Sequence, residues 1–270
     1  MSRDLPVTIE GDGPALLCLH GGPGLSDYLA MLGEETAGWR RIRYTQRGLD
    51  PSTTEGPFTV AQHVADAVTV LDDLDLRDAV VLGHSWGGVL AVALLAEHPD
   101  RVRGALLVDP LGIVGDGGFE RFGEQMTART PEDVRARADE LDQRAMAGEG
   151  TAEDALESLR MVWPAYFNDP ATAPPMPDDI RLSVPCYSQT LEDVVALLAD
   201  GGLPGRAARY DGPVQVVYGR GSPMPAESAT ETAAVFPRGS STEVPDAGHF
   251  PWLEQPGCVA DGLARLAALL

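Results

Sequence analysis

The chain has 270 residues, of which 44% are hydrophobic, and this suits one large α/β domain with an insertion. Its formal net charge is −21, which excludes nucleic acids and anionic membranes as partners because both would be repelled. No stretch has the pattern of a secretory signal or the roughly 20 apolar residues of a membrane span. We therefore expect a cytoplasmic protein that acts on a small molecule; the composition leaves the oligomeric state open.

Short apolar segments that suit strands alternate with segments of helical periodicity, which predicts a mostly parallel sheet covered on both faces. The expected strands are Val7–Ile9, Ala15–Leu19, Arg41–Thr45, Ala79–Leu82, Ala105–Val108, Val214–Tyr218 and Thr242–Val244. The expected helices between them are Val60–Leu74, Gly88–Glu97 and Val259–Leu270. We predict a doubly wound α/β core formed by residues 1–114 and 212–270.

The alternation breaks between residues 115 and 211, where no segment has a good strand pattern. This stretch is rich in helix formers and is expected to be a helical cap inserted in the core, with helices at Pro131–Ala147, Thr151–Tyr166 and Leu191–Ala199. Trp163, Tyr166 and Phe167 stand at the end of the second of these helices. They are candidates to roof a substrate pocket, although such a stripe also suits simple packing.

The segment Gly83-His84-Ser85-Trp86-Gly87-Gly88 joins a predicted strand to a predicted helix. A serine at so sharp a turn is held in a strained backbone geometry that lifts its hydroxyl to an exposed tip. The glycines on either side keep side chains away where strand and helix meet closely. The pattern predicts that Ser85 is a nucleophile.

Two other segments supply the groups that such a serine needs. His20-Gly21-Gly22-Pro23-Gly24 follows the second predicted strand, so the Gly22 and Trp86 N–H groups are the expected oxyanion hole. Pro23 has no N–H to offer. His249, in Asp246-Ala247-Gly248-His249-Phe250 after the last strand, is the expected general base.

These motifs resemble those of the α/β-hydrolase family over nearly the whole chain. The H-G-G-P-G segment, Gln46-Arg47-Gly48 and G-H-S-W-G-G look like the proline iminopeptidase branch, although Thr45 stands where that branch usually has Asp. The resemblance implies an α/β-hydrolase fold with a cap, a serine hydrolase activity and no cofactor. It also implies a small substrate that could carry a free amine; Glu120, Glu153 and Glu157 are the candidate partners of that amine, and all three also suit solvated helix faces.

The acid that orients the histidine is not at its usual place. In the family it commonly lies in a Gly-x-x-Asp stretch after the penultimate strand, and here that stretch reads Gly219-Arg220-Gly221-Ser222. Some branches carry the acid one strand earlier, so Asp109, at the end of the strand after the elbow helix, is the preferred candidate. Asp246 and Glu227 are the alternatives, and a turn-forming role for Asp109 also stays open.

Several other residues have two interpretations. Arg47 could anchor a substrate carboxylate or brace its own loop. His84 is expected to point away from the catalytic face, and His63 and His98 are expected on solvated helix faces. No cluster has the spacing of a metal site and no dinucleotide or phosphate motif occurs, so we predict neither metal nor cofactor.

The sequence thus predicts a serine hydrolase that cleaves an ester or amide of a small molecule through Ser85, His249 and Asp109. A C–C bond hydrolase or lyase that uses the same pair of side chains is an alternative. A non-catalytic small-molecule receptor on the same scaffold is another alternative, because Ser222 stands where the acid is usually found.

Overall fold

The computed structural model describes residues 5–270, so residues 1–4 of the predicted core lie outside it. Within the described chain one seven-stranded sheet has the order β1-β3-β2-β4-β5-β6-β7. Only β1 is antiparallel to its neighbour, and the other strands are parallel. The strands are β1 (Val7–Glu10), β2 (Ala15–Leu19), β3 (Arg40–Tyr44), β4 (Ala79–His84), β5 (Val102–Val108), β6 (Val214–Gly219) and β7 (Gly239–Val244). The predicted α/β-hydrolase fold is confirmed.

Helices cover both faces of the sheet because successive side chains of each strand point in opposite directions. On β2, Leu17 and Leu19 join one core cluster, whereas Leu16 and Cys18 join the other. The first cluster is completed by α1 (Val60–Asp73), α2 (Trp86–Glu97), α7 (Gly202–Ala207) and α8 (Ala226–Val235). The second is completed by the 3₁₀ helix Leu29–Thr36, α9 (Pro251–Glu254) and α10 (Cys258–Ala267).

Helix α2 lies at the centre of the molecule, directly after β4. Every residue from Trp86 to Leu95 is buried, as expected of a helix that is apolar on all sides. The helix is therefore held on all sides by packing, and its first turn is a rigid support for Ser85.

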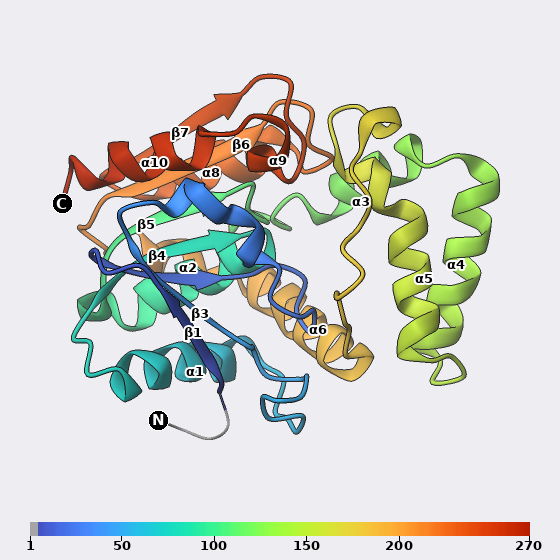
Figure 1. The fold of residues 1–270 in the computed structure, drawn as a ribbon, viewed down its shortest axis with the longest axis horizontal. Coiled ribbons are helices and arrows are strands. Elements are labelled where there is room, and N and C mark those ends of the chain that lie inside the picture. Colours follow the sequence, from blue (N-terminus) through green and yellow to red (C-terminus); the bar gives the residue numbers. More distant parts are fainter. Residues whose placement is uncertain (1–4) are drawn as a thin grey trace.

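The chain between β5 and β6 forms the helices α3 (Phe119–Arg129), α4 (Glu132–Met146), α5 (Ala152–Val162), α6 (Val184–Asp200) and α7. Figure 1 shows α3, α4 and α5 to one side, beyond the ends toward which the β4 and β7 arrows point. In contrast, α6 and α7 pack against α1 and α2. The cap boundaries at 115 and 211 stay a prediction.

The helices of this insertion differ from the expected ones in four ways. The sequence pattern predicted neither α3 nor α7, and α6 begins seven residues before the expected Leu191, with Pro185 in its first turn. The expected helix Thr151–Tyr166 ends at Val162 and continues as the 3₁₀ turn Trp163–Tyr166, because Pro164 cannot continue the hydrogen-bond ladder.

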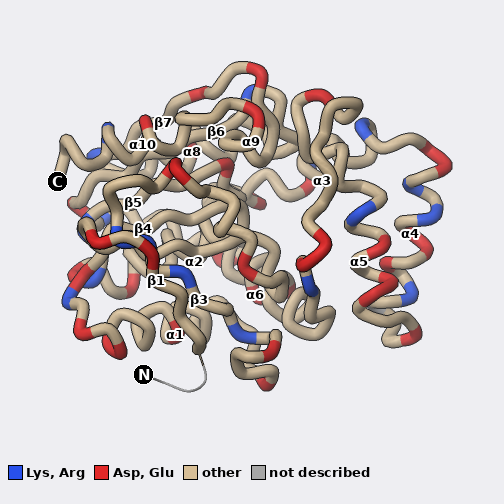
Figure 2. The backbone as a smooth tube through the Cα atoms, in the orientation of Figure 1, with Lys and Arg blue, Asp and Glu red and all other residues tan. Residues whose placement is uncertain are grey.

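Charged residues are frequent on outer helices such as α4 and α5 and on loops (Figure 2). Between residues 5 and 270 no helix combines the length and the apolar character that crossing a bilayer requires.

Candidate active site

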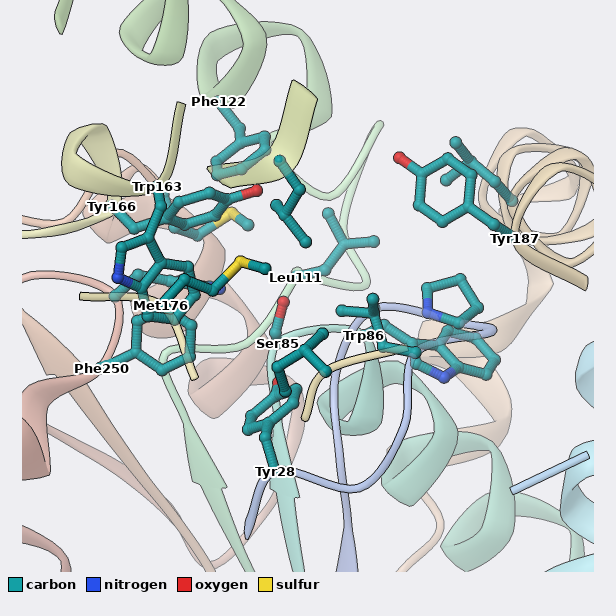
Figure 3. A pocket seen from close by; sticks show the side chains of 18 of the residues that line it. Tyr28, Ser85, Trp86, Leu111, Phe122, Trp163, Tyr166, Met176, Tyr187 and Phe250 are labelled. Carbon is teal, nitrogen blue, oxygen red and sulfur yellow. The ribbon is translucent and has the colours of Figure 1, made fainter. Parts of the chain in front are cut away.

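Ser85 lies at the turn from β4 to α2 and has a strained backbone, with φ 57° and ψ −124°. Its two glycine neighbours are required by close backbone contacts. A Cβ on Gly83 would lie 2.2 Å from Gly87 O, and one on Gly87 would lie 2.0 Å from Leu19 O. The turn directs the Ser85 hydroxyl into a cavity (Figure 3).

His249 and Asp109 form a buried pair in the loops that follow β7 and β5, the two strands on either side of β6. His249 Nδ1 lies 2.5 Å from Asp109 Oδ2, and the two residues are 3% and 1% exposed. Asp109 directly follows β5, and its N–H donates to Val217 O on β6 at 2.7 Å. Because a carboxylate oxygen only accepts, the Nδ1 atom carries the proton and the Nε2 atom is left as the basic nitrogen.

Ser85 and His249 both line the cavity. In the described chain the serine hydroxyl and the His249 ring are not hydrogen-bonded to each other; such a bond commonly tightens only when substrate is bound. Of the alternative acids, Asp246 is exposed in a turn, and Glu227 is exposed and pairs with Arg121 at 3.0 Å. Asp109 is thus the candidate acid that contacts the imidazole.

Gly22 and Trp86 line the same cavity as Ser85. The neighbouring N–H of Gly21 donates to Tyr28 Oη at 2.8 Å, but the loop hydrogen bonds of the described residues use neither the Gly22 nor the Trp86 N–H. Both groups are thus available to an oxygen atom in the cavity. Gln46 ties the two segments together, since it contacts both Trp86 Nε1 and His20 O.

Tyr28 and His84 form a buried hydrogen-bonded chain behind the site. His84 Nε2 lies 2.8 Å from His249 O, which can only accept, so Nε2 carries the proton. His84 Nδ1 then accepts from Tyr28 Oη at 2.6 Å, and Tyr28 Oη in turn accepts from Gly21 N–H. Burial, and to a smaller degree His249, holds the pKa of His84 well below its ordinary value, so the ring stays neutral.

The cavity over Ser85 has a volume of about 130 Å³ and is lined mainly by aromatic and aliphatic side chains. His249 is the one histidine among its lining residues, and none of them is Asp, Glu, Arg or Lys. Trp163, Tyr166 and Phe122 form one wall with Met176 (Figure 3). A cavity of similar size, roughly 150 Å³, holds a benzene molecule.

Phe167 and Arg47 do not line this cavity. Phe167 is fully buried behind it, stacked on Phe250 at 5.7 Å between ring centres. Arg47 makes a bidentate ion pair with Asp66, at 2.6 and 2.7 Å, and donates to Glu55 O. The expectation that Phe167 roofs the pocket is wrong, and Arg47 braces its loop rather than facing the substrate.

A second cavity, of about 380 Å³, adjoins the first and shares Gly22, Leu25 and Tyr166 with it. Asp142 of α4 is its acidic lining residue. The three glutamates considered for a substrate amine line neither cavity: Glu153 pairs with Arg160 at 2.6 Å, and Glu120 and Glu157 are exposed.

The comparison with known families agrees with this geometry. A family model described as alpha/beta hydrolase fold matches residues 14–256. The chain belongs to the α/β-hydrolase family. The site is therefore compared with those of other members of this family.

Among curated α/β hydrolases, "Putative non-heme bromoperoxidase BpoC" of Mycobacterium tuberculosis is 25% identical over 240 residues, which cover 86% of this chain and 84% of that protein. A proline iminopeptidase of Lactobacillus helveticus is 34% identical over 110 residues, 38% of this chain and 37% of that one. The crystal structure of VinJ superposes with a TM-score of 0.72 at 20% identity, covering 98% of this chain and 95% of that one.

Sequence reasoning about this hydrolase missed residues whose position depends on tertiary contacts. Tyr28 is an isolated aromatic residue, and Phe122 lies on a helix that the pattern did not predict, so neither had a clear signal. His63 was expected in solvent, but it is fully buried with its ring 5.5 Å from that of Trp86. In residues 5–270 no three His, Cys, Asp or Glu side chains gather as a metal site.

Proposed function

We propose that this α/β hydrolase is a serine hydrolase that cleaves an ester or amide whose acyl group is small, uncharged and apolar. The observation that carries the proposal is the 2.5 Å contact between His249 and Asp109 beside the cavity into which Ser85 points. The contact orients the ring with Nδ1 protonated, so Nε2 can take the serine proton.

The reaction would proceed in two halves. Ser85 Oγ attacks the substrate carbonyl while His249 Nε2 takes its proton, and the N–H groups of Gly22 and Trp86 hold the negative oxygen. His249 returns the proton to the leaving group, and the acyl group stays on Ser85. Water then releases the acid by the same steps in reverse order.

The lining of the cavity supports an uncharged acyl group. A charged group that leaves water must find a partner, and no carboxylate or guanidinium lines the space over Ser85. The aromatic wall favours an apolar group of roughly benzene size. We therefore expect phenyl-bearing and short aliphatic acyl groups to be preferred over amino-acyl groups with a free amine.

The test is turnover of p-nitrophenyl acetate, butyrate and phenylacetate by the wild type and by two variants. Asp109→Asn is expected to lower kcat by up to about 10⁴-fold, because the histidine loses its orienting carboxylate. Ser85→Ala is expected to lower kcat by about 10⁶-fold. Glu227→Gln, which removes a rejected acid candidate on the surface, serves as the matched control and is expected to keep full activity.

Four results would contradict this proposal. Turnover that survives in Ser85→Ala would show that Ser85 is not the nucleophile, and full activity in Asp109→Asn would show that Asp109 is not the acid. Faster release from an aminoacyl p-nitroanilide than from any of the esters would exclude the uncharged substrate class. Hydrolysis of a vinylogous diketone without ester turnover would instead assign C–C bond cleavage.

A further inference from the structure

Ser222 occupies the position at which the family commonly carries its acid, and its hydroxyl contacts the acid that this chain uses instead. Ser222 Oγ lies 2.5 Å from Asp109 Oδ2, the same oxygen that contacts His249 Nδ1. Ser222 is 8% exposed, and Asp109 is 1% exposed. The three side chains therefore form one buried, connected group.

The direction of the serine bond is fixed by its neighbours. Met224 N–H donates to Ser222 Oγ at 3.0 Å, and the ionised carboxylate of Asp109 can only accept. The serine proton thus points to Asp109. Bonds of this kind, from a hydroxyl to a carboxylate, are short and about twice as strong as bonds between neutral groups.

The Asp109 carboxylate is held from three sides. Oδ1 accepts from Gly219 N–H at 3.0 Å, and Oδ2 accepts from both Ser222 and His249. The segment that carries Ser222 is fixed in turn by Arg129 of α3, which donates to Gly221 O at 2.6 Å and to Ser222 O at 3.3 Å. Ser222 does not line the substrate cavity, so its effect on the reaction passes through Asp109.

We propose that Ser222 is a positioning residue for the Asp109 carboxylate. The inference rests on the proposed function. Ser222 Oγ and His249 Nδ1 both lie 2.5 Å from Asp109 Oδ2, so the serine proton and the imidazole proton meet the same oxygen. Removal of the serine hydroxyl would leave that oxygen with His249 as its side-chain donor.

The test removes the Ser222 hydroxyl in one variant and keeps it in another. With p-nitrophenyl acetate, Ser222→Ala is expected to lower kcat about 10-fold with an unchanged KM. A carboxylate that loses one donor attracts the His249 proton more strongly, so the acid limb of the pH profile of kcat/KM should move to higher pH. Ser222→Thr, which keeps the hydroxyl, should recover at least half of the lost activity and the wild-type profile.

The matched control is Ser228→Ala. Ser228 is another buried serine of the same region, but its hydroxyl donates to Gly117 O at 2.8 Å, away from Asp109. This variant is expected to lose some stability while keeping the wild-type kcat and pH profile. A wild-type pH profile in Ser222→Ala, or failure of Ser222→Thr to recover activity, would overturn the positioning role.

These outcomes are separable from failure of the proposed function. If the wild type turns over no ester, or if Ser85→Ala keeps the activity, the serine hydrolase proposal itself fails. If turnover depends on Ser85 and Asp109 but not on Ser222, only the present inference fails.

Discussion

At the scale of single residues, the site depends on side chains that hold other side chains. The chain from Gly21 N–H through Tyr28 Oη and His84 to His249 O joins the loop that carries Gly22 to the backbone of the candidate base. Each bond has one possible direction, and the buried His84 ring stays neutral. The loop and His249 are therefore held at a fixed separation by groups that never touch the substrate carbonyl.

Tyr28→Phe tests this connection, because it removes the hydroxyl and keeps the ring. We expect kcat for p-nitrophenyl acetate to fall about 10-fold, since Gly21 N–H loses its acceptor and the neighbouring Gly22 N–H is less well placed. Loss of a buried hydrogen bond should also lower the free energy of unfolding by about 1–2 kcal/mol. Steady-state kinetics measures kcat, and urea unfolding measures the free energy of unfolding.

The control for this variant is Tyr210→Phe. Tyr210 is also buried, and its hydroxyl donates to Val102 O at 2.9 Å, at the start of β5 and thus at the opposite end of the sheet from Ser85. Tyr210→Phe should lower the free energy of unfolding by a similar amount and leave kcat unchanged. Equal kcat values for the two variants would show that the Tyr28 hydroxyl contributes only to stability.

Residues defined by a local motif could be predicted from the sequence, whereas residues defined by burial could not. Ser85 and His249 were found from glycine-bounded turns after strands, and Asp109 from its place one strand after the elbow. Phe167 stands beside Trp163 and Tyr166 in sequence but points into the core. Only the three-dimensional packing separates such neighbours, and the same is true of His63 in α1.

At the scale of elements, α3 and α6 form the side walls of the cavity. The sequence analysis missed α3 although Phe119, Phe122 and Met126 recur at the spacing of one helix face, because the segment is otherwise mostly polar and is interrupted by Gly123. None of its residues is buried. The loops after β6 and β7 are tied to the same insertion: His249 N–H donates to Tyr166 O at 2.7 Å, and Glu254 accepts from both Gly248 N–H and Asn168 N–H. The insertion thus holds the candidate base in place and also lines the cavity over Ser85.

Phe119, the first residue of α3, separates the cavity over Ser85 from an apolar groove of about 260 Å³ between α3 and α6. Phe119 and Leu111 line both spaces, and Val195 lies on the rim of the groove. Phe119→Ala should join the two spaces and so admit longer acyl chains. Each buried CH₂ contributes about 0.8 kcal/mol, so the ratio of kcat/KM for p-nitrophenyl octanoate to kcat/KM for p-nitrophenyl acetate should rise about 10-fold or more.

Two further variants check the Phe119 prediction. Adding Val195→Asp to Phe119→Ala should reverse the gain in kcat/KM for the octanoate ester and leave that for the acetate ester unchanged. Ile9→Ala is the control: its side chain is 37% exposed, close to the 39% of Phe119, but it lies on β1 outside the groove, so the chain-length profile should stay that of the wild type. An unchanged chain-length profile in Phe119→Ala would contradict the assignment of this residue as the dividing wall.

At the scale of the whole molecule, three buried histidines make stability depend on pH. Burial lowers the pKa of His20 and His84, and it lowers the pKa of His63 to about 3. Above pH 6.5 these rings are neutral in both the folded and the unfolded chain. Below it the unfolded chain takes up protons that the folded chain refuses, so stability falls as the pH falls, until the folded pKa of each ring is reached.

His63→Gln isolates one of these contributions. Each such histidine changes the free energy of unfolding by about 1.4 kcal/mol per pH unit in this window. Between pH 7.5 and pH 5 the wild type should therefore lose about 2 kcal/mol more than His63→Gln. Urea unfolding at both pH values measures this difference. The control His98→Gln, at the partly exposed end of α2, should keep the wild-type dependence of the unfolding free energy on pH. If His63→Gln lost as much stability as the wild type between the two pH values, the prediction would be contradicted.

The overall topology was predictable because the alternation of strand and helix patterns is strong in the core. Strand bounds shifted by a few residues at most, as at β5, which begins at Val102 rather than at Ala105. Within the insertion the prediction was uneven: α4 was placed to within one residue at each end, whereas α3 was missed and the start of α6 was placed seven residues too late. The cavity wall, and with it the acyl preference, belongs to that less predictable part.

The central claim is that the Ser85 hydroxyl is made nucleophilic by His249 and Asp109. Intact-mass spectrometry after reaction with a fluorophosphonate tests it most directly. We predict a single adduct, located on Ser85 by peptide mapping, absent from Ser85→Ala and formed at least 100-fold more slowly in Asp109→Asn. An adduct on another residue, or equal labelling rates in the wild type and Asp109→Asn, would contradict the account.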